Sequence, residues 1–346
     1  MKLTRILFIV LAIVHLSPPR LLASDLYMVS SDTQSVRRYS DQGVFISDFV
    51  APGAGGLVAP SGLAFGPDGN LYVADNSLNQ ILRYSANGTF IDVFASDPQL
   101  NGPTDLVFRG DDLFVGLWNN SGNTGGVARV DRTTGAVETT FGTGSFRRTH
   151  SITFGSDGNL YASSFDTRSI RVFNPDTGAS VREFGSSSTV DRPMGITFNQ
   201  DGNLIVNNWN GDVRLIDSSD GSVISTLVSG LSNTQWHALA PDGTLIIDNW
   251  GAKSLGRYNV DGTFIESFAA LGLTPDKFIF YQAVPEPPTG IGLILFMTVA
   301  VCFRSRRDSR YKLQTDPRPL PYFCPSRVAL RTSIVVVNQN DYGQNP

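Results

Sequence analysis

Residues 66–75 read Gly-Pro-Asp-Gly-Asn-Leu-Tyr-Val-Ala-Asp, and this stretch decides the fold because the chain keeps returning to it. Its Asp68-Gly69 pair is typical of a hairpin turn, since glycine accepts the positive φ that such turns require. Residues 71–74 alternate between two faces, which is the period of a β-strand. The stretch therefore predicts two antiparallel strands joined by a tight turn.

The same unit recurs along the chain, and the leucine after its turn marks each copy. The markers are Leu26, Leu71, Leu113, Leu160, Leu204 and Leu245. Their successive spacings are 45, 42, 47, 44 and 41 residues. A third apolar strand, a glycine turn and a fourth strand follow each marker, as in residues 81–84 and beyond. Four short antiparallel strands in each period of about 40–50 residues are typical of propeller blades.

The first copy lacks its first strand, because the repeat begins with the second strand at Asp25. The spacing places a seventh first strand near residue 280, where residues 278–281 are apolar and aromatic. We expect this C-terminal strand to complete the first blade and to close the ring, which removes open sheet edges. The prediction is an all-β, six-bladed β-propeller of four-stranded antiparallel blades over residues 25–283.

The pattern of residues 60–65 (Pro-Ser-Gly-Leu-Ala-Phe), 68–75 and 81–84 (Ile-Leu-Arg-Tyr) resembles the NHL-repeat propellers. The resemblance covers residues 25 to about 283 and is specific to the fold. It does not favour one activity over another, because binding proteins, lyases and lactonases share this scaffold.

Residues 1–24 are expected to be a signal peptide. Lys2 and Arg5 precede an apolar run at residues 6–14, and the small residues Ala23 and Ser24 offer cleavage points. This order is typical of secretory signals. An uncleaved anchor helix is the alternative.

Residues 284–307 form three successive parts. They are a proline block (Val284, Pro285, Glu286, Pro287), an apolar run at 291–303 and a basic group (Arg304, Arg306, Arg307). The order is similar to the PEP-CTERM sorting signals of Gram-negative bacteria. That resemblance implies processing by an exosortase and delivery to the cell surface or extracellular matrix. Although 13 apolar residues are fewer than the roughly 20 of a full span, the arginines suit a cytoplasmic end. We therefore expect transient membrane anchoring as a transmembrane segment, with a buried strand or helix as the alternative.

Residues 308–346 depart from that pattern, because such signals end the chain soon after the basic group. The extension contains several prolines and no repeat, so we expect a disordered tail. A gene-boundary artefact is the other explanation.

The composition of residues 25–284 limits the partners. This part has 16 Lys and Arg against 27 Asp and Glu, a balance of −11. Such a balance opposes phosphate binding, and no basic stripe with aromatics appears, so nucleic acid is not an expected partner. Both cysteines, Cys302 and Cys324, lie beyond the propeller. A domain of this size can be held by its core alone, and we expect a monomer.

Candidate ligand-binding residues lie where second strands end and first strands begin, because these ends meet at one mouth of the ring. Five residues after each marker come Ser31, Asn76, Trp118, Phe165, Trp209 and Trp250. The expected starts of first strands are Ser61, Thr104, His150, Met194 and Trp236. The proposed site comprises Trp118, Trp209, Trp236, Trp250, Asn119, Asn208, Asp248 and Asn249. Indole faces beside amides and carboxylates suit sugar rings, and packing between blades is the alternative.

A catalytic metal is not expected. His150 and His237 are the only histidines of the predicted propeller and are weak candidates for ligands, because a catalytic site needs three protein ligands. Resemblance to gluconolactonase-type propellers would imply a glutamate near the mouth, yet none occurs at a first-strand start. The repeated turn aspartates are explained by turn geometry rather than by calcium binding. They are Asp68, Asp157, Asp201 and Asp242.

These features together predict a secreted, surface-sorted and non-catalytic propeller. We expect it to bind a glycan, a peptide or a component of the extracellular matrix, without a cofactor. The alternative is a divalent-metal-dependent lyase or lactonase that acts at the mouth.

Overall fold

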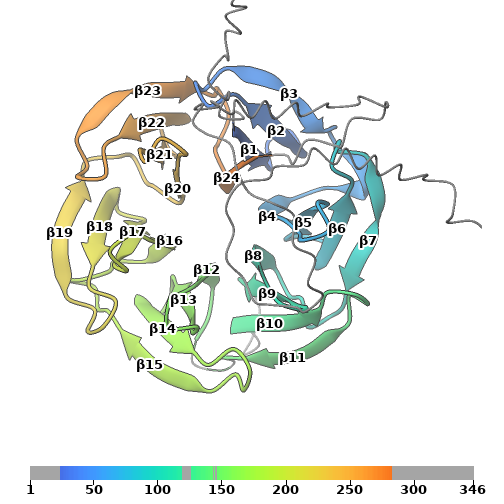
Figure 1. Ribbon diagram of the computed structural model, residues 1–346, viewed down its shortest axis with the longest axis horizontal. Coiled ribbons are helices and arrows are strands. Elements are labelled where there is room, and N and C mark those ends of the chain that lie inside the picture. The colour runs from blue at the N-terminus through green and yellow to red at the C-terminus, as the bar shows by residue number, and fades with distance from the viewer. Residues whose placement is uncertain (1–23, 119–125, 143, 145, 283–346) are drawn as a thin grey trace, which may run out of the picture. The chain divides into compact units, whose positions relative to one another are not determined.

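A computed structural model describes residues 24–118, 126–142, 144 and 146–282. These residues form six four-stranded antiparallel sheets arranged as a ring around a central axis (Figure 1). The predicted fold class, an all-β six-bladed propeller, is confirmed.

The blades are numbered in chain order, and each is given from its innermost strand outward. Blade 1 is β24 (Phe278–Tyr281), β1 (Asp25–Ser30), β2 (Ser35–Tyr39) and β3 (Phe45–Val50). Blade 2 is β4 (Pro60–Phe65), β5 (Leu71–Asp75), β6 (Gln80–Tyr84) and β7 (Phe90–Ser96), preceded by a short 3-10 turn, η1 (Ala54–Gly56). Blade 3 is β8 (Pro103–Arg109), β9 (Asp112–Leu117), β10 (Gly126–Asp131) and β11 (Val137–Phe141).

The other three blades repeat this order. Blade 4 is β12 (Thr149–Phe154), β13 (Leu160–Ser164), β14 (Ser169–Phe173) and β15 (Ser180–Phe184). Blade 5 is β16 (Pro193–Phe198), β17 (Leu204–Asn208), β18 (Asp212–Ile216) and β19 (Val223–Val228). Blade 6 is β20 (His237–Leu239), β21 (Leu245–Asn249), β22 (Ser254–Tyr258) and β23 (Phe264–Ala270).

The C-terminal strand closes the ring, as predicted. β24 pairs with β1 in antiparallel register, with Phe278 opposite Met28 and Tyr281 opposite Asp25. Phe278 is buried and packs in one cluster with Leu26 and Met28. The innermost strand of blade 1 thus comes from the far end of the chain (Figure 1).

The recurring turn is built by its aspartate side chain. Asp68 Oδ1 accepts the Asn70 N–H at 3.1 Å, and Asp68 Oδ2 accepts the Tyr72 hydroxyl at 3.0 Å. The turn in blade 5 differs, because Asn199 Oδ1 accepts the N–H groups of Asp201 and of the residue two positions further on. The prediction that Asp201 forms its turn is therefore wrong in detail, since an asparagine two residues earlier does so.

Apolar clusters between neighbouring blades supply the core. The second strands are buried on both faces, as the fully buried β5 and β13 show. Tyr27 of blade 1 packs edge-on against Phe65 of blade 2, with ring centroids 5.1 Å apart. This packing fixes each blade against the next and holds the starts of the first strands close to the axis.

The described residues contain no helix that is long and apolar enough to cross a membrane. The predicted membrane segment 291–303, the rest of the sorting signal within 284–307 and the tail 308–346 lie outside the described residues. So do residues 1–23 of the predicted signal peptide and the candidate Asn119.

Candidate functional site

The mouth is the end of the ring at which second strands end and first strands begin. The backbone ties these two ends together in the same way in several blades. The Trp118 N–H donates to the Gly102 carbonyl at 2.7 Å, and the Trp209 N–H donates to the Arg192 carbonyl at 3.2 Å. The two accepting residues have φ of 65° and 56°, the left-handed region, so the chain turns sharply before the next strand. Each aromatic side chain is thereby held at the rim of the mouth.

A continuous row of aromatic side chains, here called the aromatic arc, runs along this rim over blades 3 to 6. It consists of Trp118, Phe165, Trp209 and Trp250, all half-buried. Successive ring centroids are 5.6, 6.1 and 5.6 Å apart. The first three line a cavity of about 350 Å³ whose wall also includes His150 and Gln235. The structure thus brings three of the four predicted tryptophans together at the mouth.

The fourth predicted tryptophan lies deeper than expected, and so does one histidine. Leu63 pairs with the residue two after Leu71, and His237 pairs with Ile247, two after Leu245. His237 is therefore equivalent to Leu63 and Gln235 is equivalent to Ser61, although β20 itself begins at His237. Aligning Trp236 with Ser61 was wrong by one residue, because the turn in blade 6 has the same length as in blade 2. Counting back ten residues from the marker would have given Gln235.

Trp236 forms part of the floor of the mouth. Its side chain is 5% exposed, and its ring centroid lies 4.6 Å from that of His150. The Lys277 ammonium lies 5.5 Å from the centroid of the same indole. Lys277 also forms an ion pair with Asp105, whose side chain is 1% exposed. These residues cross the axis beneath the mouth.

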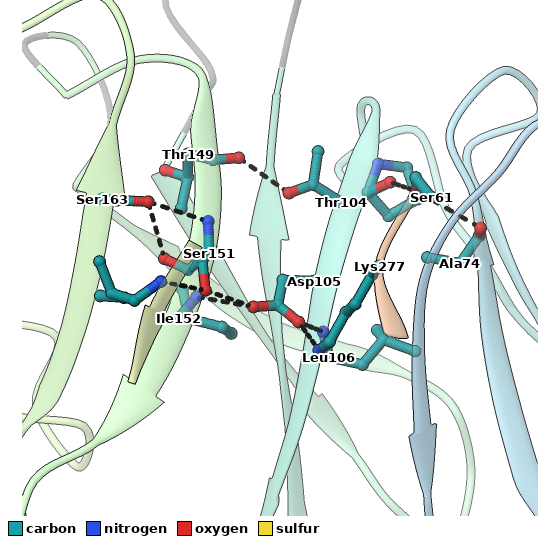
Figure 2. Close-up of polar contacts among 12 residues, drawn as sticks. Ser61, Ala74, Thr104, Asp105, Leu106, Thr149, Ser151, Ile152, Ser163 and Lys277 are labelled. Carbon is teal, nitrogen blue, oxygen red and sulfur yellow. Dashed lines mark hydrogen bonds and ion pairs between the residues drawn. The ribbon is translucent and has the colours of Figure 1, made fainter. Parts of the chain in front are cut away.

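Asp105 joins three parts of the ring, as Figure 2 shows. Its Oδ2 accepts the Ser151 hydroxyl at 3.0 Å and the Ile152 N–H at 2.8 Å, both from blade 4. Its Oδ1 accepts the Leu106 N–H at 2.8 Å and the Lys277 ammonium from the segment before β24. The pair Asp105 and Lys277 is not among the residues predicted from the sequence. The two residues occupy equivalent positions in their repeats, because each directly precedes the apolar residue that pairs two positions after a marker leucine, Leu106 opposite Val115 and Phe278 opposite Met28.

Hydroxyl groups connect neighbouring blades around the mouth. Ser61 Oγ donates to the Pro103 carbonyl at 2.6 Å, and Thr104 Oγ1 donates to the Thr149 carbonyl at 2.8 Å (Figure 2). Small polar residues at first-strand starts therefore join one blade to the next. The predicted starts Ser61 and Thr104 are confirmed by the strand register.

The two histidines occupy different environments. His150 borders the mouth, is 7% exposed and has no hydrogen-bond partner at Nδ1. Burial lowers its pKa to about 3, although the Gln235 side chain acts in the opposite direction, so the ring is neutral near pH 7. His237 lines a second cavity of about 270 Å³ further along the axis. Its Nε2 is 2.6 Å from Thr197 Oγ1 and its Nδ1 contacts the Asn207 amide, so both ring nitrogens are satisfied.

The geometry offers no cluster of metal ligands in the part of the chain that is described. No group of three or more His, Cys, Asp or Glu side chains there is placed to hold a metal ion. His150 and His237 do not converge on one point, because each belongs to its own cavity.

The predicted polar partners of the tryptophans hold the loops of the mouth. Asn208 is buried and donates to Asp212 at 2.6 Å, while Asn249 Oδ1 accepts the Ser232 N–H at 2.9 Å. Asp248 is buried and accepts the Thr234 hydroxyl at 2.6 Å, and burial raises its pKa to about 7. These side chains support the walls of the mouth, whereas Asn76 and Gln235 line it beside the arc.

Comparison with known proteins shows the fold and no more. No protein-family model matches the chain, and no curated protein matches its sequence. A chain of the nidogen/laminin complex is 15% identical with a TM-score of 0.63, over 75% of this chain and 99% of that one. A streptogramin B lyase is 19% identical with a TM-score of 0.55, over 73% and 84%. A protein of unknown function from Bacteroides caccae is 13% identical with a TM-score of 0.58, over 75% and 99%. The chain therefore shares the propeller fold with proteins from both a binding complex and a lyase.

Proposed function

We propose that this protein is a non-catalytic propeller that binds a glycan at its mouth. The observation that carries the proposal is the aromatic arc, a row of four adjacent half-buried rings of which three line an open cavity. Aromatic rings at such a surface supply large apolar area with little loss of conformational freedom. Sugar rings have apolar C–H faces that suit these side chains, and their hydroxyls can meet Asn76 and Gln235. A peptide or another component of the extracellular matrix is the competing ligand.

The alternative is a divalent-metal-dependent lyase or lactonase at the same mouth. It is favoured by the likeness to a streptogramin B lyase, which concerns the fold alone. It would need ligands that converge, whereas His150 and His237 line separate cavities. Metal analysis of the purified protein tests this alternative. A tightly bound divalent ion that is lost in His150→Ala would favour the enzyme over the binding protein.

Export and surface sorting complete the proposal and rest on the sequence of the two ends. Residues 1–24 would direct export, and residues 284–307 would anchor the chain transiently until an exosortase releases the propeller to the cell surface or matrix. A monomeric propeller without a cofactor would then present its mouth outside the cell.

Trp209→Ala tests whether the arc binds the ligand. Trp209 is half-buried, so its truncation should cost only about 1–2 kcal/mol of unfolding free energy. Retention on the exopolysaccharide of the producing organism should nevertheless fall at least tenfold, because a stacking platform is lost. Pull-down and a thermal melt measure the two effects on the same sample.

The matched variant is Trp236→Ala, which removes the same side chain from a buried position. Trp236 is 5% exposed, so its truncation should leave a cavity and lower the free energy of unfolding by about 3–5 kcal/mol. If Trp209→Ala is as unstable as Trp236→Ala, or if a stable Trp209→Ala retains the polysaccharide fully, the arc packs between blades and is not the site.

Glu286→Gln and the replacement of Arg304, Arg306 and Arg307 by glutamine test the sorting signal. Each change should leave the protein in the membrane fraction at its larger mass, because the processing enzyme no longer recognises the segment. Arg310→Gln, just beyond the basic group, is the control and should be released normally. Normal release of all variants would show that residues 284–307 are not read as a signal.

A further inference from the structure

The positive charges of this acidic domain are distributed unevenly. The described ranges contain 14 arginines, of which 12 form an ion pair with a carboxylate. The two described arginines without such a pair are Arg147 and Arg192, and both belong to loops at the mouth, in blades 4 and 5. Arg192 stands over Phe165, which lines the cavity, and in a domain with a balance of −11 an unpaired cation there is unexpected unless something negative binds nearby.

Two arginines are held against the aromatic arc. The Arg192 guanidinium carbon lies 5.5 Å from the Phe165 centroid, and that of Arg148 lies 5.6 Å from the Trp118 centroid. Phe165 and Trp118 are themselves neighbours in the arc. A guanidinium over a ring keeps its N–H donors free at its edge, where they can bind a carboxylate or sulfate in two-point fashion.

The two arginines have the same backbone conformation in equivalent loops. Arg148 and Arg192 both have positive φ, 51° and 56°, and each stands directly before the strand that begins its blade. Arg148 lines the cavity and has one carboxylate nearby, Asp166, at 3.5 Å. The charge of Arg148 is thus partly balanced, whereas Arg192 has no carboxylate partner among the described residues.

A buried polar atom at the same cavity also points to a ligand. His150 Nδ1 has no hydrogen-bond partner, and its side chain is 7% exposed. An unsatisfied buried polar atom is costly, so such atoms are usually paired in the functional state. Because this nitrogen is itself covered, a ligand hydroxyl would supply the missing partner after a shift of the side chains around His150.

We propose that the mouth selects an anionic glycan, one whose sugars carry carboxylate or sulfate groups. The sugar ring stacks on the aromatic arc, Arg192 and Arg148 bind the anionic group, and His150 Nδ1 bonds a hydroxyl. This inference rests on the proposed glycan binding and adds the charge of the ligand to it.

The test measures binding of the purified full chain to matched polymers. Polygalacturonate is compared with its methyl ester, which has the same sugars without the charge, and dextran sulfate is compared with dextran. Polyglutamate supplies an anion without a sugar. The variants are Arg192→Gln, Arg148→Gln and Trp209→Ala, and the control is Arg132→Gln. Arg132 pairs with Asp111 at the opposite end of the ring. This control therefore removes the same positive charge at a position far from the mouth.

We expect at least one anionic polymer to bind at least tenfold more tightly than its neutral partner. Arg192→Gln should lower that affinity about tenfold, since a charge-assisted hydrogen bond is lost. Arg132→Gln should bind like the wild type. Preference within the galacturonate pair identifies a carboxylate, and preference within the dextran pair identifies a sulfate.

Three results would overturn the inference. The first is equal affinity for charged and neutral partners, or no binding of either anionic polymer. The second is an Arg192→Gln variant that matches Arg132→Gln. The third is polyglutamate bound as tightly as the sugars, which would indicate an acidic peptide. If a neutral polymer binds and Trp209→Ala releases it, glycan binding stands and only the anionic preference fails.

Discussion

Lys277→Met is expected to lower the melting temperature by about 6–20 °C. The change removes the ammonium that pairs with buried Asp105 and leaves a carboxylate in a site that is 1% exposed. Breaking a buried pair by removing one partner costs about 3–5 kcal/mol. In a domain of this size each kcal/mol corresponds to about 2–4 °C. The hydrogen bonds that Asp105 accepts from Ser151, Ile152 and Leu106 remain and place the loss at the lower part of this range.

The matched control is Arg109→Gln, which breaks an exposed pair with Asp176. Those two side chains are 40% and 70% exposed, so the pair should contribute about 0–1 kcal/mol. The double variant Lys277→Met with Asp105→Asn should recover part of the loss, because no unpaired charge stays buried. Melting by circular dichroism measures all three. A Lys277→Met variant with the same melting temperature as Arg109→Gln would show that the ion pair of Lys277 and Asp105 does not stabilise the ring.

Ending the chain after Lys277 should abolish cooperative melting, whereas ending it after Gln282 should not. The shorter chain lacks β24, so β1 keeps its pairing with β2 but loses its inner partner, which exposes Leu26 and Met28 at an open edge. The longer chain keeps the closing strand and is the matched control. Phe278→Ala is a milder version of the same test and should cost about 3–5 kcal/mol, since this side chain is 1% exposed.

Size-exclusion chromatography and thermal melts distinguish the two truncated chains. The chain that ends at Lys277 should elute as aggregate, and the chain that ends at Gln282 should elute as a monomer. Equal melting of both chains would mean that β24 is not needed to close the ring.

The sequence by itself determined the blades, their number and the way in which the ring closes. Each blade depends on a local signal, such as the Asp68-Gly69 turn followed by residues that alternate between two faces. Counting repeats then showed that the first blade needed a strand near residue 280, which β24 supplies. The rim of the mouth was also predictable, because Trp118 and Trp209 occupy the same position in their repeats.

Only the tertiary structure decided which side chains of the mouth are free and which are used by the fold. Lys277 and Asp105 are 172 residues apart, and their contact exists only because the closed ring places both beside the axis. The depth of Trp236 depends on strand register, and the unpaired Nδ1 of His150 depends on every neighbour that surrounds it. Periodicity along a chain reports which face a residue occupies, whereas pairing and exposure depend on contacts between blades that lie far apart in the sequence.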